Sequence, residues 1–570
     1  MQSGRDNAAI NLRGGEKNRL DLLKLLPADA KVILEIGCGT GLLAERYKRL
    51  NPHSQYIGIE LIPERAELAA QKLDRVLIGD AETVDLQTLG IPKATIDCLV
   101  CGDLLPGFNH PWEVLQRYNQ WLNSEGQVIA KIPNLQYWLR IANLLRGKWE
   151  NPEEERQHWF TLEGIKLLFE RAGLQVYELQ AIGFKGENFV QFQQLLQPLL
   201  TALGEERGKF ATQTGADYYL VRATKSQKPP RRLLIQTIIM APTGCDRVRV
   251  LEPDRFSATI PGVRTVSKVK SAELLTPLPE EEKVFIWQRT IMQYPAYLPK
   301  LKELLKQGYL IVAEIDDNPI RRREYADNYY LSYRGCHCVQ TSTELLAEFL
   351  RQHNPNVAVF SNQLAFLPPP RIYSADDSVT LFFGALNREK DWQPLITTLN
   401  RVLAAYKHRI RVKVIHDHRF YEALEIEQKE FEPFCSYERY QEILSSCDIG
   451  LLPLTSNPIN DMKSDLKFIE CAGYGVAVLA SPTAYENSIQ EGETGLIYRS
   501  LAEFEAKLNS LIVDTKLRRQ LAANAYQWVR DRRLLCQHYR QRRDWYLQMR
   551  DELPRLNQEL RSRVPELFVE

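Results

Sequence analysis

A glycine-rich turn near the start of the chain carries the residues best suited to hold a small ligand. The stretch Val32–Gly41 reads VILEIGCGTG, an apolar run followed by glycines at Gly37, Gly39 and Gly41. Glycine adopts backbone conformations that a Cβ forbids, and it lets the chain approach a ligand closely. The pattern therefore predicts a buried strand that runs into a ligand-binding turn, with a helix starting near Leu42.

Acidic residues stand at or near the ends of the strands expected around this turn. Glu35 lies within the first strand, Glu60 ends the second (QYIGIE), and Asp80 follows the third (RVLIGD). An acid about 20 residues after a glycine turn is placed to bind the hydroxyls of a ribose. A dinucleotide loop usually reads G-x-G-x-x-G, and the third spaced glycine is missing after Gly41. The spacing favours a nucleoside-bearing cofactor other than a dinucleotide.

This pattern of a glycine turn and acids at successive strand ends resembles class I S-adenosylmethionine-dependent methyltransferases. In that family the E/D-x-G-x-G-x-G loop wraps the methionine part of the cofactor, the acid after the second strand holds the ribose, and the acid after the third meets the adenine amine. The resemblance implies S-adenosylmethionine as cofactor, bound by Glu35, Gly37, Gly39, Gly41, Glu60, Asp80 and Ala81. The alternative is a Rossmann-like unit with another ligand or none.

Two residues are candidates for the general base of methyl transfer. Asp103 follows a fourth expected strand, residues 96–100, at the edge where open α/β sheets bind ligands. His158 begins the segment HWFT, which resembles a substrate-side segment of methyltransferases that act on small hydroxyl acceptors. An unperturbed imidazole is well suited to take a proton near pH 7. A purely structural histidine is the alternative for His158.

Composition limits the class of protein. The formal net charge of +1 creates no field that would attract nucleic acid or an anionic membrane, so we expect no nucleic-acid partner. No apolar run reaches the ~18–20 residues that span a bilayer. The polar start MQSGRDNAAINLRGG lacks the apolar core of a secretion signal. Ten scattered cysteines fit reduced thiols, and we expect a cytoplasmic location.

Two polar, proline-rich breaks divide the 570 residues, a length that suggests three or four domains of ~150 residues. They read KSQKPPRR (225–232) and LPPPR (367–371), as interdomain linkers do. The tail from about Leu534 predicts an amphipathic helix of mixed sign, which we expect to pack against its own protein. The expected domains are residues 1–225, 226–370 and 371–570.

The third domain contains a helix, a glycine and a strand in residues 464–481 (SDLKFIECAGYGVAVLAS), followed by Glu486 and the turn EGETGLI. This run resembles the donor-binding domain of retaining GT-B glycosyltransferases of bacterial surface glycans. In that family the helix glutamate holds the nucleotide ribose, a role that falls on Glu470, and residues 460–467 lie beside the donor sugar. An ordinary helix–strand unit without a ligand is the alternative.

Cations expected to neutralise a donor diphosphate lie in residues 383–392 (FGALNREKDW), which resemble the family loop G-R-L-x-x-x-K-G. Lys390 falls on the lysine position, Ala385 replaces the usual arginine, and Arg388 lies three residues later as a substitute. Met462 stands where the family usually has another glutamate. The implied nucleotide-sugar-binding residues are Lys390, Arg388, Lys467, Glu470 and Glu486.

The domain between the breaks resembles the acceptor half of the same fold. Its pair Asp316-Asp317 suggests a metal-binding D-x-D site, but GT-B enzymes generally bind the diphosphate with cations and a helix amino terminus. Capping of the following helix explains these acids equally well. Cys336-His-Cys338 lacks a second Cys/His pair at ligand spacing and is assigned to a strand. We therefore expect no metal.

Together the patterns predict an α/β protein, with a Rossmann-like class I methyltransferase domain followed by two Rossmann-like GT-B lobes. The expected function is a bifunctional transferase of surface polysaccharide. It would methylate a glycan hydroxyl from S-adenosylmethionine and move a sugar from a nucleotide donor to a glycan or lipid-linked saccharide. No transmembrane segment is expected, and peripheral membrane contact stays open. The alternative is an active methyltransferase fused to a non-catalytic, glycan- or nucleotide-binding GT-B module. The sequence names neither the sugar donor, the acceptor, the methylated atom nor the oligomeric state.

Overall fold

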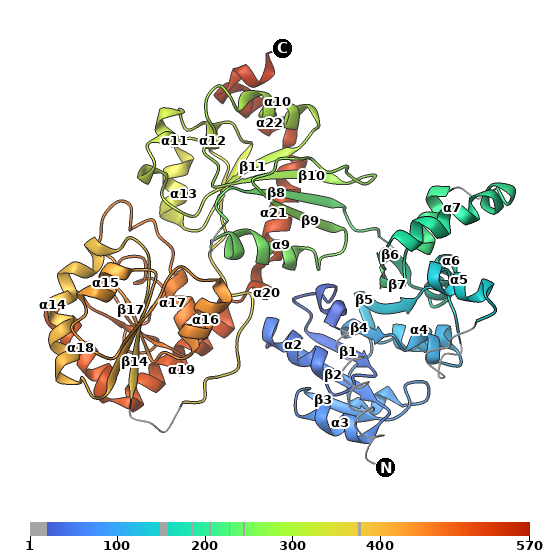
Figure 1. The fold of residues 1–570 in the computed structure, drawn as a ribbon, viewed down its shortest axis with the longest axis horizontal. Helices are drawn as coiled ribbons and strands as arrows, with labels where there is room; N and C mark the ends of the chain where they lie inside the picture. The colour runs from blue at the N-terminus through green and yellow to red at the C-terminus, as the bar shows by residue number, and fades with distance from the viewer. Residues whose placement is uncertain are drawn as a thin grey trace. The chain divides into compact units, whose positions relative to one another are not determined.

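The structure of the protein is a computed structural model that divides into two compact units (Figure 1). The first unit comprises residues 1–231 and 258–262, and the second comprises 232–257 and 263–570. The described residues are 20–148, 158–183, 186–204, 207–226, 228–242, 245–373 and 378–569, so the polar start predicted to lack a secretion signal lies outside them. Among the helices in these ranges, none combines the length and apolar character needed to cross a membrane.

The first unit is built on a seven-stranded sheet in the order β3-β2-β1-β4-β5-β7-β6. Strands β1 to β5 pair in parallel, and β7 is antiparallel to both β5 and β6. The strands are β1 (Val32–Ile36), β2 (Gln55–Glu60), β3 (Arg75–Ile78), β4 (Ile96–Gly102), β5 (Leu122–Pro133), β6 (Gln175–Ile182) and β7 (Tyr218–Thr224). The order reverses between β1 and β4, and open α/β sheets bind ligands beyond the carboxyl ends of the strands at such a point.

Helices cover both faces of this sheet, which is why its inner strands are almost entirely buried. The 3₁₀ helix η1 and α2 pack on one face, and α4 and α6 pack on the other. The helical elements are η1 (Leu20–Lys24), α2 (Leu42–Leu50), α3 (Pro63–Ala70), α4 (Pro111–Asn119), α5 (Trp138–Leu145), α6 (Leu162–Arg171), α7 (Glu187–Ala202) and α8 (Arg207–Thr214).

The second unit has two lobes, each with a six-stranded parallel sheet. The first lobe has the order β13-β12-β11-β10-β8-β9 and the second β16-β15-β14-β17-β18-β19. The predicted fold class, a Rossmann-like unit followed by two parallel-sheet lobes, is therefore confirmed. The strands are β8 (Leu233–Ile239), β9 (Val263–Val269), β10 (Glu282–Gln288), β11 (Leu310–Glu314), β12 (Cys338–Thr341), β13 (Val357–Val359), β14 (Val379–Gly384), β15 (Ile410–Ile415), β16 (Lys429–Glu432), β17 (Ile449–Leu452), β18 (Ala477–Ala480) and β19 (Leu496–Ile497).

The helical elements of this unit fall between its strands and in a run at its carboxyl end. They are η4 (Arg247–Leu251), α9 (Glu252–Ser257), α10 (Leu298–Lys306), η5 (Pro319–Arg321), α11 (Glu324–Asp327), α12 (Leu331–Arg334), α13 (Glu344–Arg351), α14 (Glu389–Ala405), α15 (His418–Ala423), α16 (Tyr437–Ser445), α17 (Leu466–Gly473), α18 (Leu501–Val513), α19 (Thr515–Arg532), α20 (Leu535–His538), α21 (Arg540–Asp551), α22 (Leu553–Arg563) and η6 (Pro565–Phe568).

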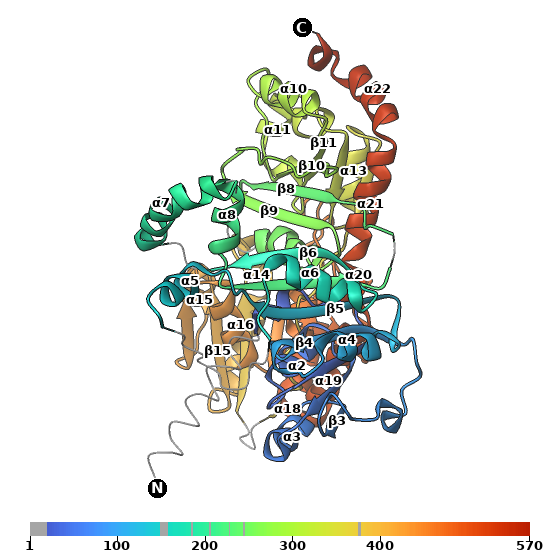
Figure 2. The ribbon, with the colours of Figure 1, turned by 90° about the vertical axis from the view of Figure 1, so that its right-hand side faces the viewer.

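The carboxyl-terminal helices return to the first lobe, although the sequence grouped them with the second. Figure 2 shows α21 beside the first-lobe sheet, and Tyr546 Oη donates to Gln340 Oε1 at 2.6 Å. Leu560 and Leu567 join the same hydrophobic core as β10 and β11. The predicted packing of the tail against its own protein is observed, and its partner is the first-lobe sheet.

The Cys336-His337-Cys338 segment lies in and next to a strand, as predicted, since β12 begins at Cys338. The Nδ1 atom of His337 accepts a hydrogen bond from the Ile311 backbone at 2.9 Å, and burial lowers the pKa of His337 to about 4. The ring is therefore neutral at pH 7 and structural. No cluster of three metal-binding side chains occurs within the described ranges.

A buried ion pair ties η4 to the first-lobe sheet. Arg249 Nε lies 2.7 Å from Glu314 Oε1, and both side chains are at most 1% exposed. Arg249 Nη1 also donates to Phe360 O at 2.5 Å and to Asn362 Oδ1 at 3.0 Å. Burial raises the pKa of Glu314, and the guanidinium opposes that rise. The carboxylate therefore depends on Arg249 to stay charged in the core.

Arg249→Met should destabilise the second unit by ~3–5 kcal/mol, because it leaves the Glu314 carboxylate buried without its cation. Urea unfolding of the full chain measures the loss. The double variant Arg249→Met/Glu314→Leu should recover much of it, since no buried charge is then left unpaired. An unchanged unfolding midpoint for Arg249→Met would contradict this account of the pair.

Candidate functional sites

The glycine turn between β1 and α2 adopts backbone angles that favour glycine. The φ angles are 66° at Gly37, 58° at Gly39 and 78° at Gly41, all left-handed. A Cβ at Gly37 would lie 2.3 Å from Leu104 Cδ1, and one at Gly41 would lie 3.2 Å from Ala69 Cα. The backbone angles therefore favour glycine at both positions, and at Gly41 a Cβ would also crowd the backbone of Ala69.

Glu60, at the end of β2, is joined to this turn. Its Oε2 accepts a hydrogen bond from Gly39 N at 2.8 Å, and its Oε1 accepts one from Ile62 N at 3.1 Å. Each carboxylate oxygen has a second lone-pair direction, so these bonds orient the group without using up its acceptor capacity. The structure thus brings Glu60 and Gly39 together at the carboxyl ends of β1 and β2.

Glu35 faces a different environment. Its side chain is buried at 1% exposure and accepts a hydrogen bond from Tyr56 Oη at 2.9 Å. Burial, and then the neighbouring Glu35 charge, raise the pKa of Tyr56 well above its usual value, so the phenol remains a donor. Tyr56 belongs to the core under η1 and α2. Glu35 therefore lies within that face of the sheet, and the sequence did not identify Tyr56 as its partner.

The third expected cofactor segment lies after β3. Asp80 is exposed, and its Oδ1 accepts a hydrogen bond from Glu82 N at 2.9 Å. Ala81 is buried, and its carbonyl accepts from Tyr118 Oη at 3.0 Å. The backbone is therefore anchored at Ala81, while the Asp80 carboxylate stays open to solvent.

The two candidate bases meet the loop that follows β4. Asp103 is half-buried just after that strand. The backbone N–H of His158 donates to Pro106 O at 2.9 Å, and its Nε2 lies 3.0 Å from Asn109 O. A carbonyl oxygen only accepts hydrogen bonds, so Nε2 carries the proton of the neutral ring. Nδ1 is then the nitrogen that can take a proton.

Imidazole ¹⁵N NMR of the full chain should show the neutral His158 ring as the Nε2–H tautomer. The physical reason is the Asn109 carbonyl facing Nε2. A His158→Gln variant assigns the signal by its disappearance. Detection of the Nδ1–H tautomer would contradict the assignment of Nδ1 as proton acceptor.

In the second lobe, Glu470 is held by two tyrosines of α16. Tyr437 Oη donates to Glu470 Oε1 and Tyr440 Oη donates to Oε2, each at 2.9 Å. Burial, and then Glu470, raise the pKa of both tyrosines well above the usual value. Lys467 Nζ donates to Tyr440 Oη at 3.1 Å and lies 3.7 Å from Glu470 Oε2. The carboxylate is thus fixed in position at the buried end of this network.

The tyrosines were missed from sequence, although they stand three residues apart on α16 in the run SYERY. Residues at that spacing share one face of a helix. That spacing was the available signal. It does not reveal that this face lies against Glu470, because the contact depends on how α16 and α17 pack.

The predicted cations differ in environment. Arg388 Nη1 lies 3.1 Å from both Asp391 Oδ2 and Asn460 Oδ1, so its charge is paired within the lobe. Lys390 is exposed in the first turn of α14, and its ammonium forms no ion pair with any residue described. Ala385, at the usual arginine position, packs against the core. Of these two cations, Lys390 is the one whose charge is exposed to solvent.

Glu486 lies apart from this network. Its side chain is 55% exposed and forms an ion pair with Arg499. Of the five predicted nucleotide-sugar residues, the structure joins Lys467 and Glu470 directly. Glu486 has no contact with either of them among the described interactions.

The loop containing Met462 crosses to the first lobe. Met462 packs against the first-lobe core, and its carbonyl accepts from Thr343 Oγ1 at 2.9 Å. Lys463 Nζ lies 3.1 Å from Asp317 Oδ1. Methionine at this position thus adds an apolar contact between the lobes, where a glutamate would place a charge.

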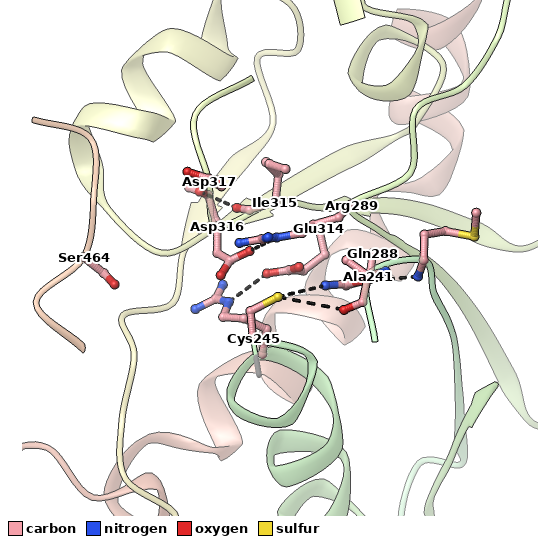
Figure 3. Close-up of polar contacts among 12 residues, drawn as sticks. Ala241, Cys245, Gln288, Arg289, Glu314, Ile315, Asp316, Asp317 and Ser464 are labelled. Carbon is pink, nitrogen blue, oxygen red and sulfur yellow. Dashed lines mark hydrogen bonds and ion pairs between the residues drawn. The ribbon is translucent and has the colours of Figure 1, made fainter. Parts of the chain in front are cut away.

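The two aspartates that follow β11 are both ion-paired. Asp316 Oδ1 lies 2.5 Å from Arg289 Nε, and Figure 3 shows these side chains directed toward one another. Asp317 contacts Lys463 and Arg321. The cap of η5 is Asn318, whose Oδ1 accepts from Ile320 N at 2.8 Å. The capping role expected for the aspartates is therefore filled by their neighbour.

Comparison with known families gives two matches that do not overlap. A family described as "Methyltransferase domain" matches residues 11–179, and one described as "Glycosyl transferase-like" matches residues 393–545. A curated relative is the tRNA (guanine-N(7)-)-methyltransferase of Clostridium kluyveri, 24% identical over 172 residues, which are 29% of this chain and 75% of the relative.

Two solved structures with a similar fold are also found. HepE of Anabaena in complex with UDP-glucose is 16% identical, covers 55% of this chain and 99% of its own, and has a TM-score of 0.41. TarM of S. aureus is 11% identical, covers 47% of this chain and has a TM-score of 0.38. The match spans 54% of the TarM chain, about half its length.

Proposed function

We propose that this chain, in which an S-adenosylmethionine-dependent methyltransferase domain precedes a glycosyltransferase domain, is a bifunctional enzyme of surface polysaccharide synthesis. It methylates a hydroxyl of a glycan and extends the same glycan, or its lipid-linked precursor, with a sugar from a nucleotide donor. It works in the cytoplasm, where its ten scattered cysteines would stay reduced thiols. The formal net charge of +1 argues against a nucleic-acid acceptor such as tRNA.

One contact gives the main support for the methyltransferase activity: the Glu60 carboxylate accepts a hydrogen bond from Gly39 N at 2.8 Å. It places two oriented acceptor oxygens beside a glycine turn at the carboxyl edge, where a ribose diol can reach them. Asp80 follows β3, the strand next to β2, and its carboxylate is exposed to solvent. We assign to it the hydrogen bond with the adenine amine. The glycines Gly37, Gly39 and Gly41 give the methionine part room, and Tyr56 holds Glu35 in the strand that leads into the turn.

The protein has little covalent chemistry to perform in this half. The cofactor supplies a methyl group already activated by a sulfonium. The chain's own residues align the acceptor hydroxyl and take its proton as the new C–O bond forms. Nδ1 of His158 is the first candidate for that proton, and Asp103 is the second.

Glu60→Ala should weaken S-adenosylmethionine binding to the full chain about tenfold or more. Two hydrogen bonds to a carboxylate are worth ~1.5–3 kcal/mol each, and 1.4 kcal/mol is a factor of ten. Isothermal titration calorimetry measures the affinity. Glu67→Ala, which removes an exposed carboxylate from α3, is the matched control and should bind normally. Equal affinity of Glu60→Ala and the parent would remove Glu60 from the site.

The glycosyl half rests on Glu470 for the ribose and Lys390 for the diphosphate. Tyr437 and Tyr440 hold the Glu470 carboxylate in one orientation. Less conformational entropy is then lost when a nucleotide binds to it. Lys390 is exposed, so its charge is available to an anion. We propose that the donor is a nucleoside-diphosphate sugar bound without a metal. Arg388, already paired with Asp391, positions the loop more than it neutralises the ligand.

A second candidate is a glycosyl module that binds its nucleotide without transfer. The packing of Met462 against the first lobe favours it, because no carboxylate is then present at that position of the loop. Binding and turnover separate the two candidates. Hydrolysis or transfer from a bound nucleotide sugar supports the enzyme, and binding alone supports the module.

Lys390→Ala should lower the affinity for UDP or GDP about tenfold while leaving the bare nucleoside unaffected, because only the former carries the diphosphate charge. Titration of the full chain without added metal measures both ligands. Lys407→Ala removes an exposed lysine after α14 and serves as the control. Failure of any nucleoside diphosphate to bind at millimolar concentration, or an equal effect on both ligands, would overturn the donor-site assignment.

A further inference from the structure

A pocket in the first lobe lies outside the sites described above. It has a volume of about 270 Å³, and none of its lining residues belongs to the predicted sites. The lining residues are Tyr294, Tyr329, Leu331, Arg334, Arg563, Val564 and Glu566. Tyr294 lies between β10 and α10, three further residues lie between α11 and the end of α12, and the others lie at the end of α22 and in η6. The carboxyl-terminal helices therefore complete the pocket.

Two exposed aromatic rings form one wall. Tyr294 is 41% exposed and Tyr329 is 63% exposed, and their rings meet edge to face with centroids 5.6 Å apart. Tyr329 and the next residue, Tyr330, both have left-handed φ angles, 53° and 52°. Non-glycine residues rarely hold that conformation, and such strain gathers at binding sites. The backbone therefore holds the Tyr329 ring at the pocket despite its exposure.

Charged side chains beside these rings also line the pocket. Arg334 donates to the carbonyl oxygens of Tyr329 and Arg563 and forms no ion pair with any described residue. Two of its five N–H donors are used in this way, so three are available. Arg563 Nη1 lies 3.9 Å from Glu559 Oε2, a long ion pair. Glu566 accepts a hydrogen bond from Tyr294 Oη at 3.2 Å. Two guanidiniums and one carboxylate leave the pocket net positive.

We propose that this pocket binds a single sugar ring that bears a negatively charged substituent. The C–H face of the ring lies against the exposed tyrosines, which combine an apolar surface with polar hydroxyls. The ring hydroxyls bond to Glu566 and Tyr329 Oη, and the charged substituent pairs with the free donors of Arg334. The volume lies just below the ~300–1,000 Å³ of drug-sized pockets, which fits one ring better than an oligosaccharide.

Ligand-observed NMR and calorimetry of the full chain test this site with glucuronate, glucose 1-phosphate, glucose and inorganic phosphate. Glucuronate or glucose 1-phosphate should bind at least tenfold more tightly than glucose and than inorganic phosphate, and their comparison tells which substituent is preferred. Tyr329→Asn should lower that affinity tenfold or more, since asparagine tolerates the left-handed backbone and removes only the ring. Arg334→Gln should abolish the preference for the charged sugar.

Two controls locate the binding. Arg323→Gln removes a guanidinium that is 89% exposed in the same lobe, and it should bind as the parent does. Lys390→Ala should also bind the charged sugar normally, because that lysine belongs to the other lobe. Circular dichroism checks that Arg334→Gln is folded, and Tyr329→Asn stands as the second variant if it is not. Absence of binding, equal binding of glucose, inorganic phosphate binding as tightly as the charged sugars, or indifference to Tyr329→Asn would each overturn the proposal.

Discussion

Parallel strand pairing is the constraint on which both halves of this protein depend. In a parallel sheet all carboxyl ends meet at one edge, so the register decides which distant residues become neighbours. Pairing of β1 with β2 sets Ile36 opposite Ile59, and the backbone of Ile59 then accepts from Gly37 and Cys38. The glycine turn is therefore fixed beside Glu60 by the register before any ligand contributes.

The same constraint works in the second unit with different side chains. Pairing of β10 with β11 sets Gln288 opposite Glu314, which brings Arg289 and Asp316 to one edge. Pairing of β14 with β17 places the loops that carry Arg388 and Asn460 within hydrogen-bonding distance. Arg388 and Asn460 are 72 positions apart in the sequence, and strand pairing brings them into contact. The helices stabilise these contacts after the strands have positioned them.

The sequence predicted the fold well because its signals are local. Apolar runs that end in glycine or acid mark the strands, and the strand–turn–helix pattern of Val32–Gly41 needs no information from elsewhere in the chain. Individual acids such as Glu60 and Glu470 were chosen as candidates on the same kind of local signal, since each belongs to a motif in its own segment.

The missing parts are partners supplied by distant segments. Tyr56 reaches Glu35 from the neighbouring strand, and Tyr437 reaches Glu470 from another helix. Arg388 and Lys390 look alike in the sequence, yet Asp391 and Asn460 engage only the former. No local pattern distinguishes these two cations, because the distinction depends on packing. The helical tail was predicted as a helix, while its partner sheet was set by long-range contacts.

The return of α21 and α22 to the first lobe has a consequence for biosynthesis. The last strand of that lobe, β13, ends at residue 359, and α21 begins at residue 540, about 180 residues later. At a synthesis rate of ~5–20 residues per second, the ribosome needs roughly 10–35 s to cover that interval. During this time the first-lobe sheet has emerged without the helices that complete its core. The methyltransferase domain can fold while synthesis continues, whereas the core of the first lobe is complete only after α22 and η6 have been made.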